Sequence, residues 1–547
     1  MEPVPITPED PVKVLGKSIL ASENPASLIQ QLSPQDYFQI IKTLDENEVM
    51  PLLESGSPDQ WQCVLDLELW DRDHLDPVKT SRWLHLLYQA DSRQLIQWLL
   101  DEGESLGSYF LSRTVEVEAI TEPNEAKDLP EGFFSLDGHF YLRFKDPGYG
   151  ENLVDILRTI AVEDYEKYQN LLLELESVIP AELEEELYRL RNIRLAEQGF
   201  LPFEEALAVY TPLEPAALKV TKSQAPLIEL TPESESLNPV PLLPLAQTRT
   251  RNQFLEVAAG IRDPFLLGKL RLEFAGLANQ ILAADRFTTF ETEALIRACD
   301  RAARLINLAI EKVCGRDLNA IEDLLRQNSL VTLFQVGFGL VQKIKWEAER
   351  WRKNSWFHRQ GLGTSFWGER GKALDGLLKK RPNFYAGSQS TEPYRDFERL
   401  SDLRESLEVL QSLMVMDGLL KKMAARYPLP EALPHRPETT FYTLLFNFWA
   451  RQRLHLETSF SGLSLGEAKR FLSELQGPSP HPPFIGENFR TVFINDLMAQ
   501  TAGADPQAAA LLEMTLGRIW DDFQEDYGRI SSEELDPRFF QFLTIEP

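Results

Sequence analysis

The first hundred residues alternate between short stretches of helical hydrophobic spacing and signals for a turn. Apolar residues recur on one helix face at Tyr37, Ile40 and Leu44, and a similar spacing follows Trp61. A small polar residue and a proline open four such stretches: Asn24-Pro25, Ser33-Pro34, Ser57-Pro58 and Asp76-Pro77. The polar side chain can accept from free N–H groups at a helix start, where proline lacks only an unused donor. The pattern predicts helices of about three turns.

Helices this short cannot bury an apolar face alone, so neighbouring helices must stack. Ser33 and Ser57 lie 24 residues apart, with a further amphipathic piece at 46–56 between them. This spacing indicates pairs of helices, and the pattern continues to Gly103. We therefore expect residues 1–110 to form a helical-repeat domain, arranged as a small solenoid.

After this domain the hydrophobic period changes from helical to alternating. Residues 113–120 alternate like a strand, and Asp137-Gly138 separates two aromatic-rich runs in 133–144, which is a hairpin signal. We expect a small β-hairpin insert over residues 111–150.

The remainder of the chain is mainly helical in pattern. A helical segment is expected over 151–210 and a large helical C-terminal region over 251–547. Between them, residues 211–250 contain seven prolines and little periodicity, which predicts an exposed linker. The expected fold class is mainly α: an N-terminal short-helix solenoid, a β-hairpin insert and a large helical C-terminal half.

Composition narrows the classes of function. Acidic residues outnumber basic ones by 84 to 56, so the net charge of −28 opposes binding to nucleic acid. Three scattered cysteines form neither a disulfide framework nor a cysteine zinc site. The start of the sequence lacks signal-peptide features, and the most apolar segment, 330–342, is shorter than a membrane span. We expect a cytoplasmic protein without membrane insertion.

Two resemblances to known families rest on particular stretches. Residues 24–103 resemble the cytosolic helical N-terminal domain of MgtE-type magnesium transporters, through their turn signals and leucine spacing. Nearly the whole chain resembles an uncharacterised bacterial family, through the stretches 65–77, 133–144, 333–345 and 381–397. The second resemblance implies no activity and no catalytic residues. The first implies a helical superhelix but not transport.

The segment GLSLG at 462–466 matches the G-x-S-x-G pattern of a hydrolase nucleophile, with Ser464 as the candidate. That chemistry needs a strand, a tight turn and a helix within an α/β sheet, and no such pattern surrounds Ser464. Glu467 follows three residues later, at the head of an amphipathic stretch. The sequence therefore favours a helix capping box over a nucleophile.

An acidic loop at 66–77 supplies candidate oxygen ligands for a divalent cation, with Asp71, Asp73 and Asp76 as the weak candidates. The spacing does not match a calcium-binding loop, and Asp76 is expected to cap a helix. We favour a solvated or salt-bridged loop over a metal site.

The stretch 343–381 has the most unusual composition, with eleven basic residues against four acidic ones and four tryptophans. One hypothesis is a binding face that joins cations to aromatic side chains. Its candidate residues are Trp346, Arg350, Trp351, Arg352, Lys353, Trp356 and His358. The alternative is that the tryptophans are core and the cations pair with acidic helices of the same chain. Its glycines do not form a nucleotide-binding loop, so no cofactor is expected.

The functional expectation is a cytosolic interaction or regulatory scaffold whose partner is another protein. Stacked helices commonly present an extended face to partners. The alternatives are an enzyme with a pocket among the C-terminal helices, or a regulator that responds to divalent cations.

Overall fold

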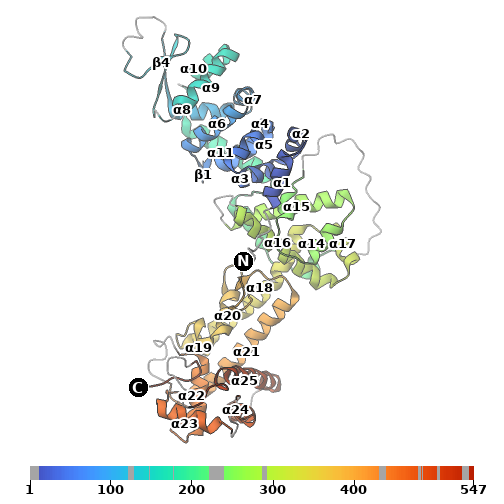
Figure 1. Cartoon of the computed structure of the whole chain (residues 1–547), viewed down its shortest axis with the longest axis vertical. Helices are drawn as coiled ribbons and strands as arrows, with labels where there is room; N and C mark the ends of the chain where they lie inside the picture. Colours follow the sequence, from blue (N-terminus) through green and yellow to red (C-terminus); the bar gives the residue numbers. More distant parts are fainter. Residues whose placement is uncertain are drawn as a thin grey trace, which may run out of the picture. The chain divides into compact units, whose positions relative to one another are not determined.

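The chain is mainly α-helical and divides into two compact units, Met1–Val336 and Gly337–Pro547 (Figure 1). In the described ranges the strands form only short antiparallel pairs and one three-stranded sheet, which confirms the expected fold class. The computed structural model describes residues 11–120, 129–146, 148, 150–175, 178–220, 240–285, 292–429, 439–477, 482, 484–501, 505–532 and 541–546.

Short helices make up the beginning of the first unit. They are α1 (Pro11–Leu20), α2 (Pro25–Gln30), α3 (Pro34–Thr43), α4 (Glu46–Ser55), α5 (Pro58–Glu68), α6 (Pro77–Ala90), α7 (Ser92–Leu99) and α8 (Glu104–Thr114). All four polar–proline pairs begin a helix as predicted. The side chain of the polar residue accepts from the backbone in each case, at Asn24, Ser33, Ser57 and Asp76.

These short helices pack on helices two positions further along the chain: α1 on α3, α3 on α5, α2 on α4 and α4 on α6. Gln60 of α5 reinforces the arrangement, because its amide donates to the carbonyls of Ile29 and Leu32 at 2.8 and 2.9 Å. Each helix therefore buries its apolar face against neighbours, as its length requires. A regular solenoid stays a prediction.

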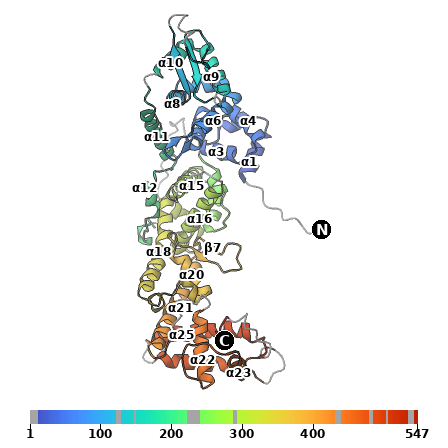
Figure 2. The ribbon, with the colours of Figure 1, turned by 90° about the vertical axis from the view of Figure 1, so that its left-hand side faces the viewer.

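The expected hairpin is present as part of a three-stranded antiparallel sheet in the order β3-β5-β4. Its strands are β3 (Val115–Ala119), β4 (Phe134–Ser135) and β5 (Phe140–Phe144). Gly138 takes a φ of 82°, and Asp137 accepts from the N–H groups that follow it. Phe140 is buried and lies 6.3 Å from the ring of Tyr168 on α10 (Tyr165–Glu174). The sheet lies beside α9 (Gly150–Glu163) and α10 in Figures 1 and 2.

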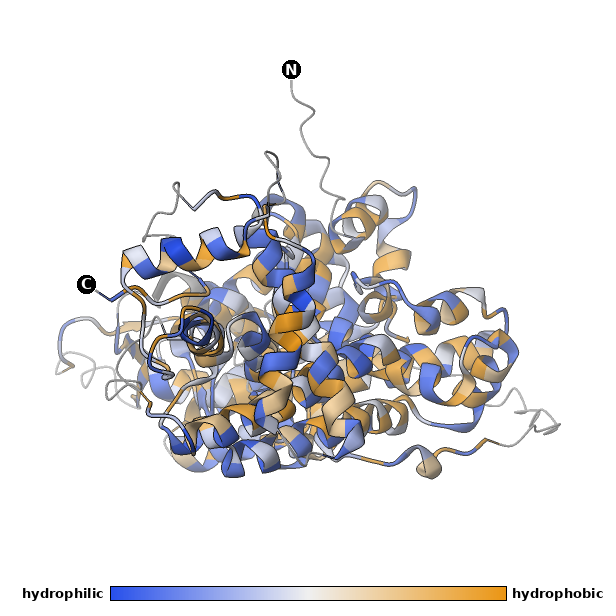
Figure 3. Cartoon of the chain, turned by 90° about the horizontal axis from the view of Figure 1, so that it is seen from below, coloured by the Kyte–Doolittle hydropathy of each residue, from blue (hydrophilic) through white to orange (hydrophobic). Residues whose placement is uncertain are grey.

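Longer helices follow in the first unit. A two-residue pair, β1 (Trp70–Asp71) and β2 (His74–Leu75), precedes them. The further elements are α9 (Gly150–Glu163), α11 (Pro180–Glu197), α12 (Phe203–Ala206), η3 (Leu207–Tyr210), η4 (Pro215–Ala217), α13 (Leu243–Ala246), α14 (Gln253–Gly260), α15 (Pro264–Ala284), α16 (Thr292–Cys314), α17 (Leu318–Gln327) and α18 (Leu330–Asn354), whose residues from Gly337 onward belong to the second unit. The helices mix hydrophilic and hydrophobic residues (Figure 3). Within the described ranges, no helix is long and apolar enough to cross a membrane.

The two described flanks of the proline-rich segment 211–250 differ: most residues of 211–220 are exposed, as in an exposed linker, whereas residues 240–250 are largely packed. Both flanks contain helical turns, η4 and α13, and Leu243 is buried. The backbone N–H groups of Leu242 and Leu243 donate to the buried carboxylate of Asp36 at 2.7 and 3.0 Å. The carboxylate of Asp36 on α3 thus satisfies these two backbone N–H groups. This part of the chain can therefore pack without a periodic hydrophobic pattern of its own. Residues 221–239 lie outside the described residues.

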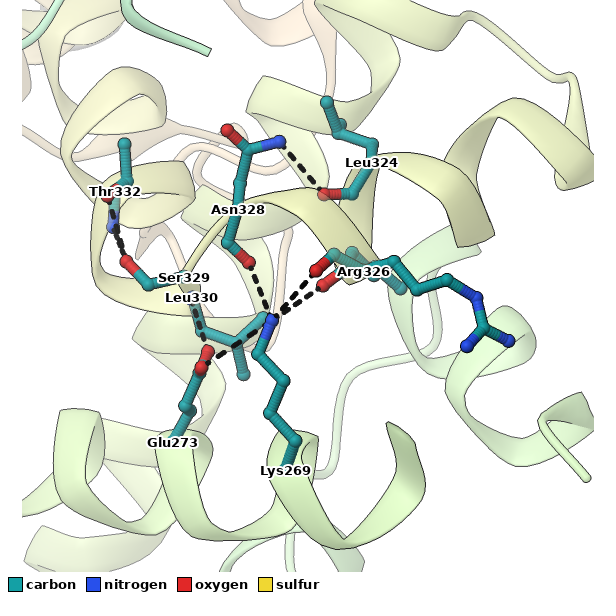
Figure 4. A network of polar contacts seen from close by, with 9 residues as sticks. Lys269, Glu273, Leu324, Arg326, Asn328, Ser329, Leu330 and Thr332 are labelled. Atoms are coloured by element: carbon teal, nitrogen blue, oxygen red, sulfur yellow. Dashed lines mark hydrogen bonds and ion pairs between the residues drawn. The ribbon is translucent and has the colours of Figure 1, made fainter. Parts of the chain in front are cut away.

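A polar network joins α15 to two other helices of the first unit (Figure 4). Lys269 donates through Nζ to the carbonyls of Leu325, Arg326 and Asn328, at the end of α17. Glu273 accepts from the backbone N–H of Leu330, at the start of α18. The network therefore satisfies backbone groups that a helix cannot satisfy internally.

Helices also build the second unit, around an aromatic core. Phe446 stacks on Phe493 and Phe523 with ring centroids 4.9 and 4.3 Å apart, and Trp449 and Trp520 are fully buried beside them. The elements are α19 (Trp356–Arg359), η5 (Thr364–Trp367), α20 (Glu369–Leu378), β6 (Phe384–Tyr385), β7 (Tyr394–Arg395), α21 (Leu400–Ala424), α22 (Phe441–Arg453), α23 (Leu465–Leu475), α24 (Asn488–Met498), η7 (Ala499–Thr501) and α25 (Pro506–Tyr527).

The last described residues, 541–546, pack on this core. Leu463 donates from its backbone to the carbonyl of Thr544 and accepts from the backbone N–H of Glu546, both at 2.9 Å. Phe542 is buried, 5.5 Å from the ring of Phe523. The segment therefore contributes a side chain to the region between α22 and α25.

Candidate functional site

The structure separates the four tryptophans of the stretch 343–381. Trp356 and Trp367 are buried at 6% and 0% exposure, as the core interpretation expects. Trp351 is half-buried, with its ring 5.4 Å from that of Phe357. Trp346, by contrast, is 48% exposed on α18. The basic, tryptophan-rich stretch 343–381 thus contributes tryptophans both to the core and to the surface.

Exposed side chains on one face of α18 form what we call the α18 stripe: Trp346, Arg350 and Lys353. Their spacing of four and three residues places them along the same side of the helix. Arg352 is exposed too, but two positions from Arg350, so it faces another side. His358 is exposed on α19, beyond the end of α18. The structure therefore unites three of the seven candidate residues.

The cations of the stretch also differ in their partners. Lys345 pairs with Glu349 and donates to the carbonyls of Lys379 and Lys380. In the part of the chain that the structure describes, Arg350 and Lys353 form no ion pair. Internal pairing thus accounts for some of the basic residues and leaves the α18 stripe available.

A buried carboxylate explains why the chain changes direction after α18. Asp417 of α21 accepts from the N–H groups of Trp356 and Phe357 at 2.8 and 2.9 Å, and so caps α19. Burial raises the pKa of Asp417, and these two hydrogen bonds partly oppose the shift. The cap turns Trp356 into the core, whereas Trp346 stays on the surface.

The second unit also contains an open pocket of about 1110 Å³. Its lining comes from η5, α20, β6, α21, α22, α25 and the C-terminal segment. The lining includes Glu369, Arg370, Lys372, Glu405, Ser406, Val409, Tyr442, Arg518, Asp522, Glu525, Asp526 and Phe542. None of the seven candidate residues lines it. The sequence predicted a pocket among the C-terminal helices, but it indicated lining residues only within the stretch 343–381.

One wall of the pocket is held by Glu369. Its carboxylate accepts from Lys372 and Ser388 at 2.7 Å each, and from the hydroxyl of Tyr385. Burial opposes ionisation, but these hydrogen bonds outweigh it and lower the pKa of Glu369 to about 2. The cluster ties α20 to the β6–β7 hairpin.

Gly371 allows η5 to lie against α20 at the same wall. A Cβ atom at this position would lie 1.9 Å from the carbonyl oxygen of Thr364. Such a distance is far below van der Waals contact, so only glycine permits this approach.

A second cluster in the lining links α20 to α22 and α25. Arg370 donates to the hydroxyl of Tyr442 at 2.5 Å and to Asp522 at 3.4 Å, and Tyr442 donates to Asp522 at 3.0 Å. Burial is the main cause that raises the pKa of Tyr442 to about 12. Among the described lining residues there is no histidine or cysteine, so carboxylates and hydroxyls dominate the pocket chemistry. Catalysis there stays a prediction.

The acidic loop uses its carboxylates for structure. Asp76 caps α6, and Asp66 accepts from Arg194 of α11 in two hydrogen bonds of 2.7 Å. Asp71 and Asp73 are exposed. The described ranges hold no group of three His, Cys, Asp or Glu side chains placed to bind a metal. Regulation by divalent cations stays a prediction that magnesium titration would test.

Ser464 is the N-cap of α23, in a capping box with Glu467. Its hydroxyl accepts from the backbone N–H of Glu467 at 3.3 Å and donates to the Glu467 carboxylate at 2.9 Å. The capping interpretation is therefore confirmed.

These features define a mainly α-helical protein with a basic, aromatic helix stripe and an open polar pocket in its second unit. The chain belongs to the family of unknown function DUF6178, which matches residues 13–546. No curated protein and no solved structure matches it. The expected membership of an uncharacterised family is confirmed, and the resemblance to the magnesium-transporter domain stays a prediction.

Proposed function

We propose that this protein is an interaction or regulatory scaffold whose α18 stripe docks an acidic segment of another protein. The observation that carries the proposal is the exposure of Trp346 beside Arg350 and Lys353, which lack ion-pair partners within the described ranges. Tryptophan and arginine are the residues that most often anchor protein interfaces.

Charge favours a protein partner over nucleic acid. A DNA or RNA duplex is a long polyanion, so a chain with a net charge of −28 would repel it. A short acidic peptide can contact the local cations alone, and the rest of the partner protein need not be acidic. Arg350 and Lys353 lie about one turn apart on the helix, so they can pair with two carboxylates at a similar spacing on a partner. The indole of Trp346 supplies a desolvated contact between the two proteins.

The test is affinity purification of the tagged full-length chain from its native host, followed by mass spectrometry. We compare the wild type with R350E/K353E, and with R404E/R529E, which makes the same change in charge at exposed positions elsewhere in the second unit. We expect a stoichiometric acidic partner with the wild type and the control, lost from R350E/K353E, with unchanged unfolding midpoints. Retention of that partner by R350E/K353E, or unfolding of this variant, would overturn the proposal.

A further inference from the structure

We propose that the pocket of the second unit binds a small organic cation that carries at least two amine groups. The proposal goes beyond the docking function and shares no residue with the α18 stripe. It rests on the size of the pocket, on which of its charged groups are already engaged, and on the polar groups left without partners.

The basic residues of the lining are engaged by the protein itself. Six acidic and three basic residues line the pocket. Arg370 is held by Tyr442 and Asp522, Lys372 by Glu369, and Arg518 lies 3.8 Å from Glu408 outside the lining. An anionic ligand would therefore have to displace hydrogen-bonded partners from two of the three cations, Arg370 and Lys372.

The acceptors, in contrast, are available. Within the described ranges, the side chains of Glu405 on α21 and of Glu525 and Asp526 on α25 make no hydrogen bond or ion pair. Ser406 lies next to Glu405, is only 5% exposed, and its hydroxyl also makes no hydrogen bond within these ranges. A ligand donor can pair with these acceptors without displacing a partner within the protein. These carboxylates and the Ser406 hydroxyl therefore favour a ligand with several N–H donors.

Two further features set the character of the cation. Three carboxylates from two helices, α21 and α25, line one pocket, so a ligand with a single ammonium group would leave most of this negative charge unpaired. Val409, Tyr442 and the buried Phe542 supply apolar and aromatic wall between them, suited to methylene groups and to a cation over a ring. Burial, followed by Glu525 and Asp522, raises the pKa of Asp526, and a bound cation would relieve that repulsion.

The experiment is isothermal titration of the full chain at low ionic strength with putrescine and spermidine. The comparison ligands are 1,4-butanediol, which has the length of putrescine without charge, and succinate, which has the opposite charge. We expect saturable binding of both amines, tighter for spermidine, and none of the diol or of succinate.

Variants separate the pocket from general attraction to an acidic protein. We expect E405Q and D526N each to weaken amine binding about tenfold, because each removes one charged hydrogen-bond acceptor. E513Q is the matched control, an exposed glutamate of α25 outside the lining, and it should bind as the wild type does.

Equal weakening by E513Q, unaltered binding by E405Q and D526N, or preference for succinate would overturn the proposal. A lysine-rich peptide serves as a final arm. Binding of that peptide without binding of the free amines would show a site for a protein segment and would overturn the assignment to a small molecule. Because R350E/K353E leaves the pocket intact, failure of the docking proposal does not affect these outcomes.

Discussion

Lys269 and Glu273 lie one turn apart on α15, and they bind the end of α17 and the start of α18, respectively. Lys269 donates at 3.1–3.4 Å to carbonyls at the end of α17, and Glu273 accepts at 2.8 Å from the first residue of α18. The end of a helix is partially negative and its start partially positive, so each side chain carries the favourable charge. A single pair of residues thus fixes the α17–α18 connection.

We expect K269M and E273Q each to lower the free energy of unfolding of the first unit by about 1–2 kcal/mol, since each leaves helix-end backbone groups without a charged partner. Urea denaturation followed by circular dichroism measures the change. K79M, at an exposed lysine of α6, is the control and should unfold as the wild type does. Equal stability of K269M and wild type would show that water replaces the lysine fully.

The pair Asp66–Arg194 should be the most costly ionic contact to break between α5 and α11. The Asp66 side chain is 6% exposed, and removal of one partner from a buried pair costs roughly 3–5 kcal/mol. Because Arg194 is 36% exposed, we expect a smaller loss of about 2–3 kcal/mol for D66A. A double-mutant cycle with R194M isolates the coupling, and additive effects would contradict it.

The cap at Asp417 predicts a fluorescence signal. D417A leaves two backbone N–H groups of α19 without an acceptor, at a cost of about 2–4 kcal/mol, and loosens buried Trp356. We expect earlier unfolding in urea and red-shifted tryptophan emission. D417N keeps one acceptor oxygen and loses the cost of a buried charge, so it should be affected less. Equal effects of both variants would argue against a capping role.

The hydrogen bonds to Glu369 predict a particular dependence on pH. Its pKa falls from 4.5 to about 2 on folding, so its stabilisation is complete above pH 4.5 and is lost as the pH falls towards 2. The free energy of unfolding should therefore differ less between pH 6 and pH 3 in E369Q than in the wild type. We expect this effect to be smaller than about 1 kcal/mol, because the Glu369 side chain is 59% exposed. E513Q should leave that difference unchanged. Urea unfolding at the two pH values measures it.

The capping box predicts a modest effect at Ser464. S464A should lower the free energy of unfolding by about 1 kcal/mol, and S464D should restore most of it, because aspartate also caps helices. Denaturation in urea distinguishes this from the nucleophile hypothesis, under which stability would be unchanged in S464A.

Local signals in the sequence predicted local structure well. The N-caps at Asn24, Ser33, Ser57 and Asp76 and the turn at Asp137-Gly138 each depend on residues within a few positions of one another. Their chemistry is therefore visible in a short stretch of sequence.

Features that depend on distant residues were not predictable in this way. Trp346 and Trp356 look alike in composition, but Asp417, some sixty residues later, turns the second one into the core. The pocket draws its lining from residues as far apart as Ser365 and Phe542, so no window of sequence contains it. The packing of residues 240–250, which depends on Asp36, was not predictable for the same reason.

The close approach of Thr364 to Gly371 gives a criterion for comparing other members of the family. Any side chain at the position equivalent to 371 would have to push η5 away from α20, and the wall of the pocket would move with it. A family member with alanine or a larger residue there should have a differently shaped opening and a different ligand. The identity of this one residue thus separates relatives that can share the proposed amine ligand from those that cannot.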